Sequence, residues 1–183
     1  RLWDVNAGKC ISILEGHTDG LRSVAINPDN SILASSSYDS TIRLWNIRSG
    51  ECVSTLQEHI GEVRTVVFSH DGSLLASGGA DASVRIWDVA AEKYLNILQG
   101  HSSTVQSLVF TPDGLNLVSS SDDKTLRIWN IATEKCLNTL HGHAGWVWST
   151  AISSDGMLLA SGSADKTVKL WSVSTGEHLN TLQ

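Results

Sequence analysis

The stretch GHAGWVWSTAISSDGMLLASGSADKTVKLW, from Gly142 to Trp171, is one copy of a unit that recurs along the chain without insertions. Tryptophan recurs every 42 residues, at Trp3, Trp45, Trp87, Trp129 and Trp171. Each of the last four follows a histidine by 28 residues and an aspartate by 6 residues. These pairs are His17 and Asp39, His59 and Asp81, His101 and Asp123, and His143 and Asp165. A fixed period of this length predicts a stack of similar units.

Each unit contains four short runs rich in Val, Ile and Leu, which predict four β-strands separated by turns. In the first whole unit the runs cover Leu21–Asn27, Ile32–Ser37, Thr41–Ile47 and Cys52–Gln57. The first turn of each unit carries an aspartate followed by Gly or Asn, residues that accept the positive φ of a tight turn. The chain divides into a half unit, 1–15, and four whole units, 16–57, 58–99, 100–141 and 142–183.

Two kinds of residue pair in these units resemble motifs of the WD-repeat β-propeller family. Trp-Asp stands at 3–4 and 87–88, and Gly-His stands at 16–17, 100–101 and 142–143. The remaining units end in Trp-Asn or Trp-Ser and depart from the motif at its last residue. The resemblance implies an all-β fold with one four-stranded antiparallel blade per unit. The similar units resemble the long repeat arrays of bacterial, especially cyanobacterial, and fungal signalling proteins.

The number of blades predicts an incomplete ring. The resemblance implies about seven blades in a closed propeller, more than this chain supplies. We therefore expect a fragment of a longer protein, with a half blade, 1–15, that lacks its two inner strands. Sheet edges and apolar faces left uncovered at both ends would favour self-association through the terminal blades.

Composition limits the classes of partner. The net charge of −6 offers no broad basic surface, so nucleic acid is not an expected partner. No run of 18 apolar residues is present, which argues against a membrane span. Cys10, Cys52 and Cys136 share one slot in their units, and we expect small apolar fillers of an outer strand, reduced in the cytoplasm. No motif for phosphate or metal appears, so we expect no metal and no cofactor.

Ser, His and Asp recur together in every whole unit, which favours a structural role, because catalysis needs one activated nucleophile rather than four. The resemblance implies a hydrogen-bonded chain of His, Ser, Asp and Trp in each blade, such as His101, Ser119, Asp123 and Trp129. In the first whole unit, Ser35, Ser36 or Ser37 could join this chain. The His, Asp and Trp positions named above, from His17 to Trp171, are therefore expected to be structural, and none catalytic.

The resemblance also implies which residues point to the top rim: the third and fifth after each histidine, and the one before each aspartate. These positions vary between units while the scaffold barely changes, so they are candidates for partner binding. The strongest are Trp146, Trp148, Arg22, Arg64, Tyr38, Glu62, Gln106 and Asp122.

Trp146 and Trp148 are two residues apart and would face the same side of a strand. They either form an exposed anchor for a partner or pack into the inner wall of the blade. Arg22 and Arg64 can make forked contacts to a carboxylate, which favours an acidic peptide over a basic one. Glu62 and Asp122 leave room for a ligand of mixed charge.

These observations predict a non-catalytic scaffold or sensor platform that binds proteins or peptides on the propeller rim. One alternative is a substrate-recognition adaptor of a larger complex, such as a ubiquitin ligase. A propeller enzyme is a further alternative, but it would need a unique acid, base or metal cluster, which the sequence does not show.

Overall fold

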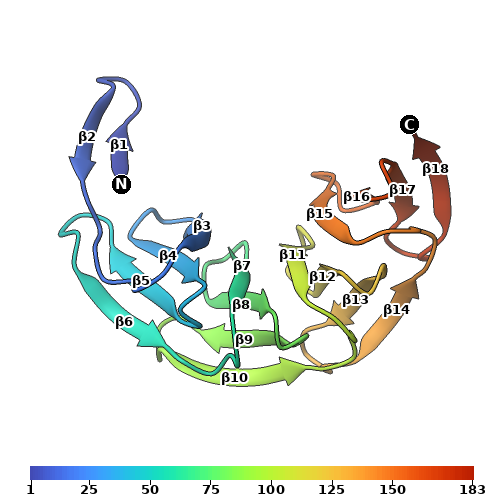
Figure 1. The fold of residues 1–183 in the computed structure, drawn as a ribbon, viewed down its shortest axis with the longest axis horizontal. Helices are drawn as coiled ribbons and strands as arrows, with labels where there is room; N and C mark the ends of the chain where they lie inside the picture. Colours follow the sequence, from blue (N-terminus) through green and yellow to red (C-terminus); the bar gives the residue numbers. More distant parts are fainter.

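A computed structural model describes residues 1–183, which form 18 β-strands and no helix. The strands make one two-stranded sheet and four four-stranded sheets, all antiparallel, arranged as an open arc with both chain ends on its open side (Figure 1). The all-β fold and the incomplete propeller predicted from the sequence are therefore confirmed.

Each four-stranded blade is built from four consecutive strands. The half blade holds β1 (Leu2–Asp4) and β2 (Lys9–Ser12). The first blade holds β3 (Leu21–Ile26), β4 (Ile32–Ser37), β5 (Ile42–Asn46) and β6 (Cys52–Leu56). The second holds β7 (Val63–Phe68), β8 (Leu74–Gly79), β9 (Val84–Asp88) and β10 (Lys93–Leu98). The third holds β11 (Val105–Phe110), β12 (Asn116–Ser121), β13 (Leu126–Asn130) and β14 (Cys136–Leu140). The fourth holds β15 (Val147–Ile152), β16 (Leu158–Ser163), β17 (Val168–Ser172) and β18 (His178–Leu182).

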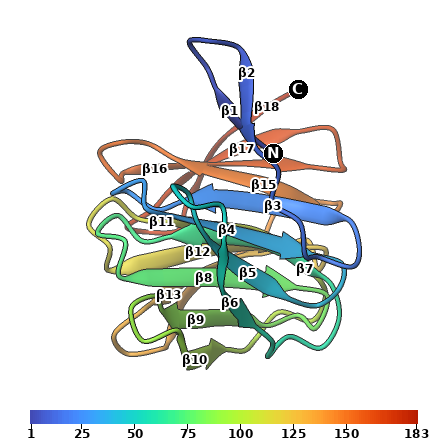
Figure 2. The same cartoon turned by 90° about the vertical axis from the view of Figure 1, so that its left-hand side faces the viewer.

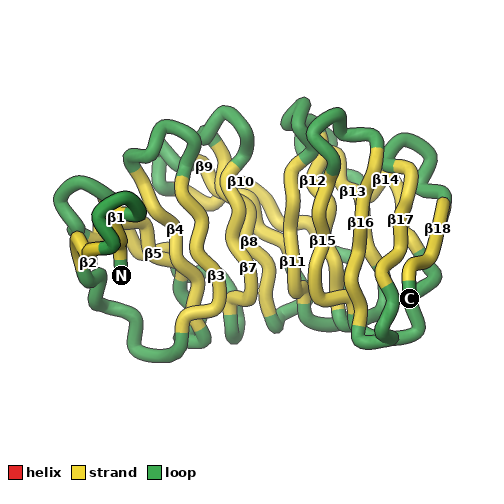
Figure 3. The backbone as a smooth tube through the Cα atoms, turned by 90° about the horizontal axis from the view of Figure 1, so that it is seen from above, coloured by secondary structure: helices red, strands yellow, loops and turns green.

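The first strand of each blade is the innermost. In Figure 1, β3, β7, β11 and β15 line the concave side of the arc, and β6, β10, β14 and β18 form its circumference. Figure 2 shows the half blade of β1 and β2 projecting above the rest of the molecule, and Figure 3 shows the four inner strands following one another along the arc. Each blade therefore contacts its neighbours through its two faces.

The apolar core lies between neighbouring blades. At the first junction the trailing face of the first blade, Ala34, Ile42, Leu44 and Leu56, packs against the leading face of the second blade, Val63, Val66, Phe68, Leu75 and Trp87. The same repeat positions meet at the next two junctions. Burial of this apolar surface stabilises the stack, because a single blade cannot cover its own faces.

The two ends of the arc leave one such face uncovered at each terminus. Leu21, Val24 and Ile26, on the leading face of the first blade, are 60%, 62% and 52% exposed. Val168 and Leu182, on the trailing face of the fourth blade, are also exposed. The half blade reaches only the outer part of the first of these faces, because it consists of two strands.

The cysteines differ from the expectation of buried apolar fillers. Cys10 and Cys52 are exposed and Cys136 is half-buried. They lie at the start of outermost strands or, for Cys10, within β2, where no further strand covers them. The Sγ atoms of Cys52 and Cys136 instead accept hydrogen bonds from Arg43 and Arg127, both at 3.7 Å.

Candidate functional site

A chain of polar side chains runs through the interior of each blade. In the third blade the indole N–H of Trp129 donates to Ser119 Oγ at 2.8 Å, and that oxygen lies 2.7 Å from His101 Nε2. His101 Nδ1 lies 2.7 Å from Asp123. The serine oxygen already accepts the indole N–H, so its hydroxyl donates to His101 Nε2. The ring proton of His101 is therefore on Nδ1, which donates to the Asp123 carboxylate.

The same chain occurs in all four whole blades. In the first blade Ser35 is the serine that takes part, bonded to His17 and Trp45. Ser37 instead donates to the backbone carbonyl of Gly20. The equivalent chains elsewhere join His59, Ser77, Trp87 and Asp81, and His143, Ser161, Trp171 and Asp165.

The aspartate of each chain is held in its charged form. Burial alone would raise the pKa of Asp123, but hydrogen bonds from His101, from the Thr125 hydroxyl and from the backbone N–H of Ser102 outweigh burial. The pKa of this carboxyl therefore lies well below its usual value. Asp39, Asp81 and Asp165 are shifted in the same direction.

This geometry resembles an Asp–His–Ser catalytic triad but cannot act as one. A nucleophile must reach its substrate, whereas Ser119 is fully buried and its oxygen already accepts the Trp129 indole N–H. The arrangement satisfies buried polar groups and ties a loop to two strands, which is a structural result.

The arginine of the third strand is oriented differently in the second blade, where Glu58 replaces glycine and Tyr94 replaces cysteine. In the first and third blades Arg43 and Arg127 lie over their tryptophan rings, and a Cβ on Gly16 or Gly100 would lie 2.6 Å from the guanidinium. Glu58 occupies that glycine position in the second blade. There Arg85 pairs with Asp81 at 3.2 Å and lies over Tyr94 instead.

The variable rim positions share a local backbone feature. In every whole blade the register between the first and second strands shifts by one residue, which leaves one extra residue on the inner strand. That bulge residue is the fifth after the histidine: Arg22, Arg64, Gln106 and Trp148. A bulge re-aims its side chain relative to the strand, and all four bulges lie on the strands that line the concave side of the arc.

Between the first two blades, three predicted residues contact one another. The Arg64 guanidinium lies over the Tyr38 ring at 4.9 Å and donates to the Tyr38 hydroxyl at 3.3 Å. Arg64 also forms an ion pair with Glu62. A carboxylate ligand at Arg64 would therefore have to displace Glu62, whereas Arg22 is exposed and has no acidic partner.

At the last two blades the surface becomes aromatic. Trp146 precedes β15 and Trp148 is the bulge residue, so the simple two-residue alternation expected from the sequence does not apply. Both are nevertheless 53% exposed, and they line one shallow depression with Lys124, Ala144, Gly145 and Ala164. Their exposure argues against the inner-wall alternative.

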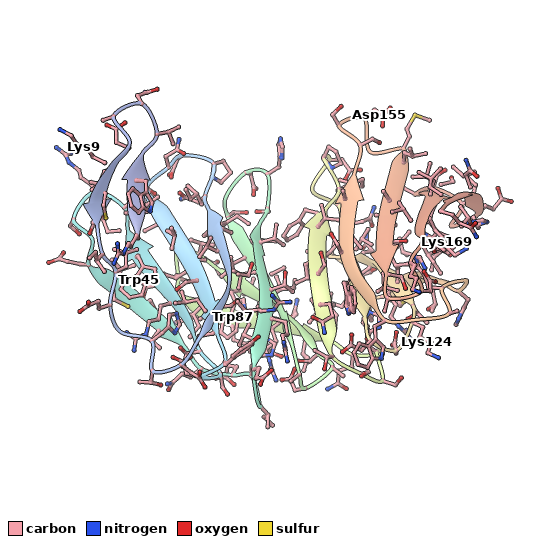
Figure 4. All side chains as sticks on the ribbon, turned by 45° about the horizontal axis from the view of Figure 1, so that its top comes forward. Lys9, Trp45, Trp87, Lys124, Asp155 and Lys169 are labelled. Carbon is pink, nitrogen blue, oxygen red and sulfur yellow. The ribbon has the colours of Figure 1, made fainter.

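Lys124 belongs to this surface although the sequence did not single it out for partner binding. It stands in the turn after Asp123 with a φ of +70°, and its end of the blades lies opposite the end that carries Asp155 (Figure 4). In the same blade Gln106 donates to Asp122 at 2.9 Å. We call the end that carries Tyr38, Lys124 and Trp146 the interaction rim.

No group of three His, Cys, Asp or Glu side chains is placed to hold a metal ion. No helix in the structure has the length and apolar character needed to cross a membrane.

A series of four-stranded antiparallel blades, each with a buried His–Ser–Trp chain, defines a WD-repeat β-propeller. A family model described as the WDR3 first beta-propeller domain matches residues 1–173, and the chain belongs to this family.

Curated relatives match over about one repeat. The chain is 49% identical over 43 residues to mitochondrial division protein 1 of Neurospora crassa and 46% identical over 43 residues to nuclear distribution protein PAC1 of Arthroderma otae. Each match covers 24% of this chain, but only 6% and 9% of the respective relatives. The likeness therefore concerns the repeat itself, and it supports a general role in protein interaction.

Proposed function

We propose that this chain is a non-catalytic interaction scaffold that binds protein or peptide partners along the interaction rim. The observation that carries the proposal is the exposed pair Trp146 and Trp148, because Trp171 already fills the scaffold position of the same unit. Tryptophan supplies a large contact area at little entropic cost and is enriched among residues that dominate binding energy. Membership of a propeller family supports protein partners in general.

The absence of a catalytic role is part of the proposal. Its support is the burial of the repeated serines, such as Ser119 and Ser161, inside the blades. The hydrogen-bonded set of His, Ser, Asp and Trp occurs in nearly the same form in all four whole blades, whereas an active site needs one distinct arrangement.

The chemistry of the rim favours a ligand with one apolar and one acidic group. The shallow depression at Trp146 and Trp148 suits an aromatic or aliphatic side chain, and Lys124 borders it with a positive charge. Arg22 is the guanidinium free to bind a carboxylate at the other end of the arc. Because Arg64 is already paired with Glu62, an acidic group of the ligand would gain less binding free energy at Arg64 than at Arg22.

An adaptor that presents substrates to a larger complex would use the same rim, and identification of the captured partner separates it from a sensor scaffold.

A cytoplasmic location is part of our proposal, since the three free thiols are typical of a reducing compartment. The net charge of −6 supports neither nucleic acid nor an anionic membrane surface as a partner. Fractionation of cells with an antibody to the chain tests the location.

The test is a pull-down that compares the native protein with a Trp146→Ala, Trp148→Ala double variant. Loss of an anchor should weaken partner capture by about 2 kcal/mol or more per residue, with little change in melting temperature. Leu137→Ala is the matched control, because Leu137 is also 53% exposed but lies on the outer strand β14. If the double variant unfolds, or captures partners as well as Leu137→Ala does, the proposed site is wrong.

A further inference from the structure

The junction between the third and fourth blades differs from the other two at one position. At the first and second junctions Ile32 and Leu74, at the start of the second strand of a blade, pack against the apolar core. The third blade has Asn116 at this repeat position, and its amide oxygen accepts a hydrogen bond from Asn130 at 3.2 Å. Asn116 lines a cavity of about 370 Å³ between the two blades. Each of these blades has all four of its strands, so the cavity belongs to a complete junction.

The walls of this cavity are partly apolar. Val173 packs against the core of the junction, and the turns before β12 and β16 contribute Pro112 and Met157. The two turns touch, since a Cβ on Gly156 would lie 3.2 Å from the Pro112 ring. The Asn138 side chain, on β14, also lines the cavity and makes no hydrogen bond in the structure. Apolar walls with a few polar groups are typical of ligand sites of roughly 300–1,000 Å³.

Two carboxylates give the cavity a negative edge. In Asp113 and Asp155, Oδ1 accepts a backbone N–H and a neighbouring hydroxyl, whereas Oδ2 makes no hydrogen bond. The hydroxyls of Thr111 and Ser153, followed by those backbone N–H groups, lower the pKa of the two carboxyls, so both are charged at neutral pH. No Lys, Arg or His lines the cavity, so the charge that it can accept is a positive one.

We propose that this cavity is a docking site for an arginine side chain of a partner polypeptide. The aliphatic stem of the arginine would pack on the apolar wall, as long charged side chains do elsewhere. The guanidinium would donate to the free Oδ2 atoms of Asp113 and Asp155, and the Asn138 amide oxygen offers a further acceptor. Arginine suits this set better than lysine, because its five N–H donors lie in one plane and can serve several acceptors at once.

The site lies at the end of the blades opposite the interaction rim. Figure 4 shows Asp155 at this end and Lys124 at the other. The charges of the two surfaces are also opposite, since Lys124 borders the rim depression and aspartates border the cavity. The proposal therefore does not depend on the function proposed for the rim.

The probe is the synthetic peptide acetyl-Gly-Leu-Arg-Gly-amide, titrated into the isotope-labelled protein and followed by NMR. We expect saturable shifts of the backbone amide signals of residues 113–116 and 155–157. Replacement of the arginine by citrulline, which has nearly the same shape but no charge, should weaken binding about five- to tenfold, because charged hydrogen bonds are lost. A peptide with lysine in place of arginine should also bind more weakly.

Protein variants test the cavity itself. Asn116→Leu should abolish binding by filling the space, and it should leave the fold intact, because the first blade has Ile32 opposite Asn46 at the same positions. Asp155→Ser should weaken binding about five- to tenfold through loss of one carboxylate. Asp29→Ser is the matched control, since Asp29 holds the equivalent turn of the first blade and lies outside the cavity.

Four outcomes would overturn the proposal. They are absence of binding to the native protein, shifts centred on another surface, equal binding of the citrulline peptide, and equal losses in Asp155→Ser and Asp29→Ser. Unchanged binding to a folded Asn116→Leu protein, checked by its melting temperature, would do the same.

Discussion

Individual histidines hold the polar chains of the blades together. His101 joins Ser119 to Asp123, and its side chain is almost fully buried. We expect His101→Ala to destabilise the protein by about 1–3 kcal/mol, because the change leaves buried polar groups without partners. Chemical denaturation checks this value against His70→Ala, a change at an exposed turn residue. Equal stability of the two variants would show that the hydrogen-bonded side chains around His101 contribute nothing to the free energy of unfolding.

The aspartates of the chains predict a loss of stability in acid. The pKa of Asp123 in the folded protein lies well below its ordinary value of 3.8. A carboxyl whose pKa is depressed on folding contributes stability that is fully present above the unfolded pKa and is lost as the pH falls towards the folded pKa. The free energy of unfolding should therefore fall as the pH is lowered below about 4.

Asp123→Asn provides the check on that acid sensitivity. The variant should be less stable at neutral pH, because the amide cannot replace the charge in the chain. Its loss of stability between pH 5 and acid should be smaller than that of the native protein, since one depressed carboxyl is gone. Parallel pH profiles for the two proteins would assign the acid sensitivity to other groups.

The strands and their grouping into blades could be predicted from the sequence, because the same pattern of residues recurs every 42 residues. Trp3 to Trp171 fix the period, and the runs between them have the length and composition of strands. The bulge at Trp148 was not readable, because it is defined by how β15 pairs with β16, which the sequence of one strand does not reveal. The position of Arg85 also escaped prediction, since the second blade departs from the first and third at two repeat positions, with Glu58 in place of glycine and Tyr94 in place of cysteine.

Turns between the second and third strands carry a backbone cost that substitution can relieve. Ala82 has a φ of +59°, and its counterparts Ser40, Lys124 and Lys166 are at 69° to 70°. Ala82→Gly should stabilise the protein by about 0.5–1 kcal/mol, because glycine adopts this region without the clash of a Cβ. The nearby Ala80→Gly should instead be neutral or destabilising, because Ala80 has no positive φ. Thermal unfolding of both variants tests the sign.

The open ends of the arc predict self-association. Val168 and Leu182 expose the trailing face of the fourth blade, which matches the type of face buried at each internal junction. We expect the 183-residue chain to self-associate as its concentration rises, measured by light scattering after size exclusion.

A charged residue on that face should weaken the association. Val168→Asp should shift the protein towards monomer, whereas Leu137→Asp, on the outer strand β14, should not. A compact monomer at all concentrations, with the scattering profile of a closed ring, would contradict the expectation.

All three junctions join the same two kinds of face, so neighbouring blades are interchangeable in principle. An exchange between gene copies that is out of register by one repeat would add or delete one blade and create no new kind of contact. The deletion of 58–99, for example, would bring Gln57 next to Gly100 in the same frame of the repeat. Because Arg64 and Glu62 would leave with that blade, inheritance could rearrange the surface seen by a partner while the architecture beneath it stayed the same.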